Sequence, residues 1–159
     1  MKNLRNVLDK LIIGICVFLF MLMTVVGTYQ ITVRYIFRSP STVSEEIISY
    51  AFAWMSMFAA TYVFGKRDHM RMVFFVERLS KKMQINLALL SELVILIFSV
   101  SVLIFGGEFI TQLSMTQMSP ALRISMGYVY SVLPTCGVVI SIYSLLNIAD
   151  LFKRLKEEA

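Results

Sequence analysis

Four long apolar stretches dominate the chain, and short polar segments separate them. Residues 11–33, 47–65 and 124–149 contain no Asp, Glu, Lys or Arg, and residues 83–107 contain only Glu92. A helix needs roughly 20 mostly apolar residues to cross the hydrocarbon core of a membrane. The pattern predicts an all-α membrane protein, with four transmembrane helices over about 11–33, 47–65, 85–106 and 126–149. We expect residues 1–159 to form a single integral membrane domain.

The positive charge of the polar segments alternates along the chain. All but three of the 15 Lys and Arg residues precede the first apolar stretch, lie between the second and third, or follow the fourth. The exceptions are Arg34, Arg38 and Arg123, which lie in the two remaining segments. Short loops rich in Lys and Arg stay on the cytoplasmic side of a membrane. We therefore expect both termini to be cytoplasmic.

The composition narrows the function classes. The chain is 58% hydrophobic and 16% charged, whereas about 25% of the residues in a soluble domain are charged. The net charge of +5 follows the topology, so we expect contact with membrane lipids and no nucleic-acid partner. Cys16 and Cys136 have no paired spacing, and His69 is the only histidine. Because the sequence shows no phosphate loop, metal-ligand spacing or nucleophile–base motif, we expect neither an enzyme nor a cofactor or metal site.

The polar segment between the second and third apolar stretches has an amphipathic pattern. Met72, Val76, Leu79 and Met83 recur at steps of four, three and four residues, which is the spacing of one helix face. We expect residues 71–84 to form a helix that lies in the cytoplasmic interface. The alternative is a plain extension of the third transmembrane helix. The aromatic and basic side chains that suit an interfacial helix are Arg71, Phe74, Phe75, Arg78, Lys81 and Lys82.

Polar residues also gather where the first two helices meet the outer side. Arg34 closes the first apolar stretch, and Glu45 and Glu46 precede the second. Carboxylates are favourable at the positive end of a helix dipole. An ion pair between Arg34 and Glu45 or Glu46 would hold the two helix ends together. Trp54, further along the second helix, is a candidate interface residue.

Glu92 is the only charged residue inside the third apolar stretch. A carboxylate at the centre of a transmembrane helix costs about 2.5–3.5 kcal/mol on insertion scales, so Glu92 should face protein or water. Two interpretations stay open at this point. Glu92 is either a proton or ion site, or a buried glutamate bonded to a neighbouring helix or subunit.

The second outer segment and the last helix carry further signals. Residues 108–126 are charged only at Glu108 and Arg123 and are rich in methionine. They predict an outer loop that packs on protein or dips into the interface. Pro134 lies in the fourth helix with Gly137 close by. Because proline removes one backbone hydrogen bond, it predicts a kink there.

Taken in order, these residues resemble the DctQ-like small membrane subunit of the tripartite ATP-independent periplasmic (TRAP) transporters. The resemblance covers nearly the whole chain and rests on four short motifs at similar spacing. The motifs are Arg34-Tyr35-Ile36-Phe37, then Ser44-Glu45-Glu46 followed by Trp54, then Lys66-Arg67-Asp68-His69-Met70-Arg71, and finally Ser119-Pro120-Ala121-Leu122 followed by Tyr128-Val129-Tyr130 and Pro134.

The resemblance implies a subunit of the bacterial inner membrane without catalysis of its own. In this family a large membrane subunit (M-type) carries the solute and sodium. A periplasmic solute-binding protein delivers a carboxylate such as sialic acid or a C4-dicarboxylate. The small subunit would then be a scaffold that braces the large one, with residues 108–126 as candidate contacts for the binding protein. Small residues beside Trp54, namely Ala53, Ser56 and Ala60, make the second helix the expected contact with the large subunit.

Two other functions remain open at the level of the sequence. One is a stand-alone, homodimeric four-helix antiporter, which would carry a glutamate inside its first helix, whereas residues 11–33 have none. The other is a membrane-surface lipid-binding protein, which rests on the amphipathic pattern of residues 71–84.

Overall fold

The computed structural model of the protein describes residues 2–66 and 81–157. Four helices in this part are long and apolar enough to cross a membrane, over Leu4–Tyr35, Thr42–Lys66, Met83–Thr116 and Met126–Lys153. The prediction of four such helices is confirmed. The elements in chain order are α1 (Lys2–Tyr35), α2 (Thr42–Lys66), α4 (Lys81–Phe98), the π-helix η1 (Ser99–Gly106), α5 (Gly107–Leu113), the 3-10 helix η2 (Ser114–Thr116), α6 (Met126–Tyr130) and α7 (Val132–Glu157).

Several of the predicted boundaries differ from the structure. Residues 2–10, which precede the first predicted transmembrane helix, form the first part of α1, and α2 begins at Thr42. Helical structure in the third span continues to Thr116, so only the second half of the predicted outer loop 108–126 is a connection. Hydropathy marks the part of a helix that meets lipid, and a helix can extend into polar surroundings beyond it.

Part of the predicted amphipathic helix lies outside the described residues. This applies to Arg71, Phe74, Phe75 and Arg78. The backbone at Lys81 and Lys82 forms the start of α4, so here the third helix begins earlier than the apolar stretch alone indicates.

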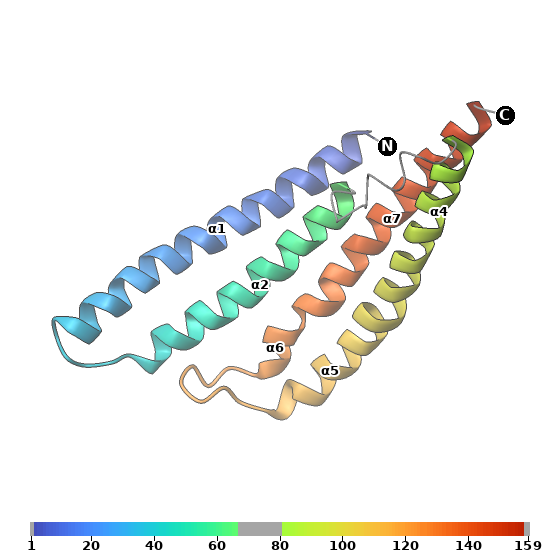
Figure 1. Ribbon diagram of the computed structural model, residues 1–159. Coiled ribbons are helices and arrows are strands. Elements are labelled where there is room, and N and C mark those ends of the chain that lie inside the picture. The colour runs from blue at the N-terminus through green and yellow to red at the C-terminus, as the bar shows by residue number, and fades with distance from the viewer. Residues whose placement is uncertain (1, 67–80, 158–159) are drawn as a thin grey trace.

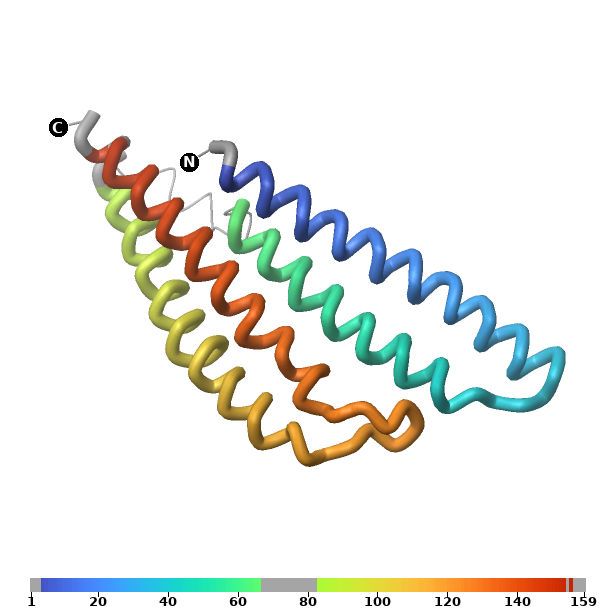
Figure 2. Tube along the Cα trace, turned by 180° about the vertical axis from the view of Figure 1, so that it is seen from behind, coloured from blue at the N-terminus to red at the C-terminus, as the bar shows by residue number. Residues whose placement is uncertain are grey.

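The long helices lie side by side in the order α1, α2, α7, α4 (Figure 1), and the view from behind shows the same order (Figure 2). The extensive contacts follow this order, with α1 on α2, α2 on α7, and α7 on α4 and η1. The two chain termini lie at the same end of the bundle as the last residue of α2, Lys66, and the first residue of α4, Lys81. We call this the terminal end. The opposite end, which we call the loop end, holds the connector 36–41 and the hairpin 117–125.

A small apolar core lies where α1, α2 and α7 meet. Its buried members are Ile12, Phe58, Val132, Cys136 and Tyr143. Most other large apolar side chains are exposed, including Phe18, Val25, Phe105 and Leu145. In a membrane such surfaces face lipid or a partner helix, so helix contacts rely on close packing and hydrogen bonds.

Glycines on α7 and at the start of α5 allow close contact between helices. A Cβ built on Gly137 would lie 2.8 Å from Leu103 Cβ, and one built on Gly107 would lie 2.9 Å from Leu133 Cβ. Small residues permit this approach of two backbones inside a membrane. The expected irregularity near Pro134 takes the form of a break at Ser131, between α6 and α7. Pro134 has no N–H for the carbonyl four residues earlier, which weakens the helix at this point.

Candidate functional site

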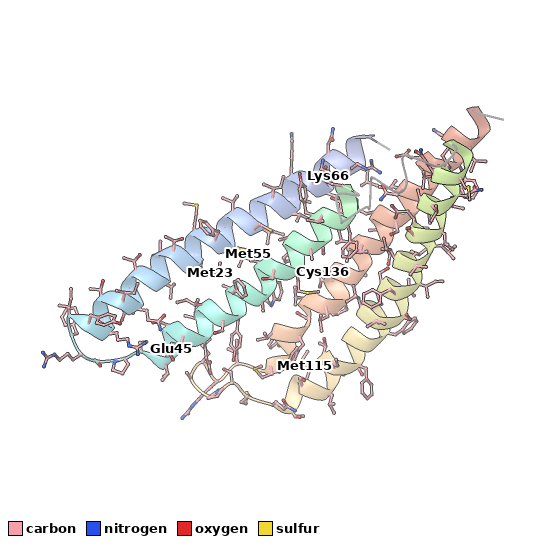
Figure 3. The ribbon with its side chains drawn as sticks, viewed as in Figure 1. Met23, Glu45, Met55, Lys66, Met115 and Cys136 are labelled. Carbon is pink, nitrogen blue, oxygen red and sulfur yellow. The ribbon has the colours of Figure 1, made fainter. Side chains whose placement is uncertain are left out.

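At the terminal end, Asp9 joins three helices. Its Oδ2 lies 2.7 Å from Lys66 Nζ on α2, and its Oδ1 accepts a hydrogen bond of 2.7 Å from the Tyr143 hydroxyl on α7. Asp9 is 7% exposed, and Lys66 lies at the last residue of α2 (Figure 3). A buried carboxylate requires such partners. This ion pair therefore fixes α1 against α2 and α7.

A second set of polar contacts at the same end includes Glu92. Asn147 on α7 donates from Nδ2 to Glu92 Oε1 over 3.0 Å, and Arg5 on α1 donates to Asn147 Oδ1 over 2.6 Å. Arg5 also lies 3.3 Å from Asp150. Glu92 is 2% exposed and Asn147 is fully buried. These contacts agree with the interpretation of Glu92 as a buried residue bonded to a neighbouring helix.

At the loop end, Glu46 binds backbone amides rather than arginine. One carboxylate oxygen accepts from the N–H of Ala121 and the other from the N–H of Leu122, each over 2.9 Å. Charge-assisted hydrogen bonds of this kind are about twice as strong as neutral ones. Because Glu46 is in the first turns of α2 and the two amides belong to the hairpin 117–125, the carboxylate ties that hairpin to α2.

The hairpin itself is held by cross-strand bonds. Met118 and Ser125 form an antiparallel bridge. The N–H of Ser119 donates to Ile124 O over 2.9 Å, and the N–H of Met126 donates to Gln117 O over 2.8 Å. The turn closed by these bonds carries the two N–H groups that donate to Glu46. The carboxylate therefore binds a segment that also has backbone hydrogen bonds of its own.

The expected ion pair of Arg34 is not present. Among the side chains that the structure describes, Arg5–Asp150 and Asp9–Lys66 form ion pairs, whereas Arg34 forms none with Glu45 or Glu46. Arg34 is exposed, while Glu45 accepts a hydrogen bond of 3.2 Å from the amide of Gln30. The physical reason is that the hairpin amides already occupy both carboxylate oxygens of Glu46, which therefore has its partners without Arg34.

An open groove lies beside this contact. It has a volume of about 550 Å³ between the first turns of α2 and the turn of the hairpin. Figure 3 shows Glu45 at this end of α2. The groove is lined by Thr42, Glu45, Glu46, Ser49, Tyr50, Pro120 and Ala121.

Trp54 faces the core of the protein. Its Nε1 donates to Val129 O over 3.0 Å, and its ring lies 6.0 Å from that of Phe58. The outward face of α2 is mostly small, with Phe52 and Val63 as its two large apolar members. We define this face as the exposed residues Ser49, Phe52, Ala53, Ser56, Ala59, Ala60 and Val63. Of the four residues expected to contact a partner, Ala53, Ser56 and Ala60 are therefore exposed, and Trp54 is half-buried.

The sequence interpretation missed Asp9, Tyr143 and Asn147 as polar contacts. Asp9 precedes the first apolar stretch, and the two other residues lie within the last one. Asn147 had a usable signal, because an amide near the end of a transmembrane helix needs a partner. In the described ranges, no cluster of three or more His, Cys, Asp or Glu has a geometry that would hold a metal ion.

Comparisons with known proteins give a consistent result. The family described as tripartite ATP-independent periplasmic transporters, DctQ component, matches residues 23–154. A putative TRAP transporter small permease protein of Haemophilus influenzae is 25% identical over 142 residues, which are 89% of this chain and 87% of that protein. The sialic acid TRAP transporter small permease protein SiaQ of Vibrio cholerae is 26% identical over 155 residues, 98% of this chain and 89% of that protein.

Proposed function

Because the chain belongs to the DctQ component family of the tripartite ATP-independent periplasmic transporters, we propose that it braces the large membrane subunit of such a transporter. In this proposal it lies in the bacterial inner membrane, with its terminal end in the cytoplasm and its loop end in the periplasm. The distribution of Lys and Arg between the two ends supports this orientation.

The outward face of α2 carries the proposal of a bracing role. Most of its residues are small, and all are exposed, although α2 lies between α1 and α7 in the row of helices. Small residues on a transmembrane helix let a second helix approach closely and gain packing contacts. We place a helix of the large subunit on this face.

The charged side chains buried near the terminal end support the same role. Asp9 and Glu92 both bond to side chains of other helices, so the described contacts hold the helices of this chain in a fixed arrangement. A fixed row of helices suits a support for a moving partner. Asp9 is buried in α1, and its bonds to Lys66 and Tyr143 are those of a structural residue. This argues against the antiporter alternative.

The transported solute is proposed from the relatives. The Vibrio cholerae relative is named for sialic acid, which is a carboxylate. We propose that the complex takes up a carboxylate such as sialic acid or a C4-dicarboxylate, delivered by a periplasmic binding protein and driven by a sodium gradient. Uptake of each solute into vesicles, with and without a sodium gradient, would test both points.

The proposed function is tested by isolating the chain from its native membrane. We expect purification in a gentle detergent, through a tag at the C-terminus, to recover a multi-spanning partner in a fixed ratio. Mass spectrometry identifies the partner. Recovery of a stable homodimer alone would contradict the bracing role and favour a stand-alone antiporter.

A further inference from the structure

Arg123 lies in the turn of the hairpin in a conformation that arginine disfavours. Its φ is 52°, and Arg38 is the only other described non-glycine residue with a positive φ. The left-handed region is readily adopted by glycine, and less readily by a residue with a long side chain. Such a strained non-glycine residue is a position at which a functional role of the side chain can be tested.

Glu46 fixes the backbone immediately before Arg123. Its two carboxylate oxygens accept the N–H groups of Ala121 and Leu122, and the N–H of Arg123 donates to Ser119 O over 3.2 Å. Three consecutive amides are therefore bonded. The turn cannot rotate freely, and the exposed side chain of Arg123 projects from a fixed base.

The loop end offers Arg123 no carboxylate partner among the described residues. Glu46 binds the hairpin, Glu45 accepts from Gln30, and Glu108 accepts from Gln112. The Arg5–Asp150 and Asp9–Lys66 ion pairs lie at the terminal end. A fixed, exposed guanidinium without a partner fits a carboxylate on another molecule, which it can bind through two parallel hydrogen bonds.

We propose that Arg123 is a contact residue for an acidic patch on the soluble solute-binding protein, and that Glu46 is the positioning residue that holds it in place. This inference rests on the proposed function, which puts the loop end in the periplasm. Charge at the rim of an interface acts mainly on the rate of encounter and on its salt dependence. Arg123 should therefore govern how efficiently the complex uses the loaded binding protein, and not the rate once that protein is bound.

The test uses the complete transporter in vesicles of neutral phosphatidylcholine, with the loaded binding protein as the varied reactant. We expect Arg123→Gly to raise the KM for that protein by about five- to tenfold, at unchanged kcat, as for loss of one charge-assisted contact. We expect Arg123→Lys, which retains the charge, to stay within about twofold of the parent. The KM of the parent should rise with salt more steeply than that of Arg123→Gly.

Two matched variants separate this role from a structural one. Arg38→Gly removes the same charge at the same end, from a residue with a φ of 51°, and it should change KM by less than about twofold because Glu46 does not hold its backbone. Glu46→Gln should raise KM as Arg123→Gly does, and the double variant should show no further rise. Glu45→Gln, at the neighbouring position, should leave KM unchanged.

The proposal fails if Arg123→Gly has the KM and salt dependence of the parent, or if Arg38→Gly has an equal effect. It also fails if the effect of Arg123→Gly appears only in vesicles with anionic lipid, which would assign the contact to a lipid headgroup. Recovery of the large subunit with every variant is measured in parallel. Loss of that subunit from the parent preparation would contradict the proposed function itself, whereas normal recovery with an unchanged KM contradicts only this inference.

Discussion

Gly137 is a residue at which a small change in size should have a large effect. An added Cβ would lie 2.8 Å from Leu103 Cβ and 3.1 Å from the backbone N of Ile104. Since a backbone atom cannot move aside as a side chain can, we expect Gly137→Ala to destabilise the protein by about 1–3 kcal/mol. Thermal unfolding in detergent would measure this as a lower Tm.

Gly14 provides the control for this prediction. It lies in α1, and an added Cβ there would meet nothing within 4 Å. Gly14→Ala should leave Tm unchanged or raise it slightly, because alanine favours a helix more than glycine does. Equal Tm values for the two variants would show that α7 and η1 do not approach each other as closely as the structure indicates.

Asp9 is the residue that we expect to matter most among the polar contacts. Asp9→Asn keeps the size of the side chain and removes the charge that faces Lys66 over 2.7 Å. We expect a loss of about 1–3 kcal/mol in the free energy of unfolding, because the buried side chain at position 9 loses its charge-assisted contact with Lys66. Replacing Lys66 by Met in the same protein should recover part of that loss.

Asp150→Asn is the comparison for Asp9→Asn. The Arg5–Asp150 pair is longer, at 3.3 Å, and both side chains are about one third exposed. Exposed pairs contribute about 0–1 kcal/mol. If Asp150→Asn proved as damaging as Asp9→Asn, burial would not be what distinguishes the two pairs.

At the scale of the elements, the break between α6 and α7 explains the position of Trp54. The helix stops at Tyr130 and resumes at Val132, and Trp54 Nε1 donates to the carbonyl of Val129. Trp54→Phe retains an aromatic ring against Phe58 but loses this donor. We expect it to lower the free energy of unfolding by about 1 kcal/mol.

Tyr128→Phe is a suitable reference for Trp54→Phe. Tyr128 is 65% exposed, so removal of its hydroxyl should leave Tm unchanged. Because Trp54 is the only tryptophan, its fluorescence in the parent also reports directly on the contact between α2 and α6. A Trp54→Phe variant as stable as the parent would show that the hydrogen bond to Val129 contributes nothing.

Sequence patterns predicted the helices well because each long helix is apolar over most of its length. Phe18 and Val25 on α1, for example, are both more than 60% exposed, and hydropathy detects such positions directly. The start of α1 was missed because Arg5 and Asp9 interrupt that signal. They belong to the helix because their charges find partners on α2 and α7.

The contact of Glu46 could not be predicted from the sequence for a different reason. Charge patterns identify side-chain partners, and they indicated Arg34 for this carboxylate. The actual donors are the backbone amides of Ala121 and Leu122. Every residue except proline has such an amide, so only the fold determines which of them reach a carboxylate 75 residues away.

At the scale of the whole molecule, the two ends of the bundle should lie on opposite sides of the membrane. Arg38 at the loop end and Lys153 at the terminal end are both exposed. We expect a cysteine at position 38 to react with an impermeant maleimide in intact spheroplasts. A cysteine at position 153 should react only after the membrane is opened.

The parent protein is the blank for this labelling, because Cys16 is half-buried and Cys136 is buried. The reverse pattern of labelling would show that the topology is the opposite of the proposed one. It would also remove the periplasmic location on which a contact between Arg123 and the binding protein depends.

The row of helices has two kinds of exposed surface, and a bulky substitution should distinguish them. Ala60 lies on the outward face of α2, and Ser91 is exposed on α4 at the far side of the row. If a helix of the large subunit packs closely on α2, Ala60→Trp must push it away, whereas lipid adapts to Ser91→Trp. We expect Ala60→Trp to reduce recovery of the large subunit at least several-fold at equal expression, because overpacking an interface costs about 1–3 kcal/mol. Recovery with Ser91→Trp should match the parent. Equal recovery with both variants would mean that the outward face of α2 meets lipid, and that the large subunit binds elsewhere on the row.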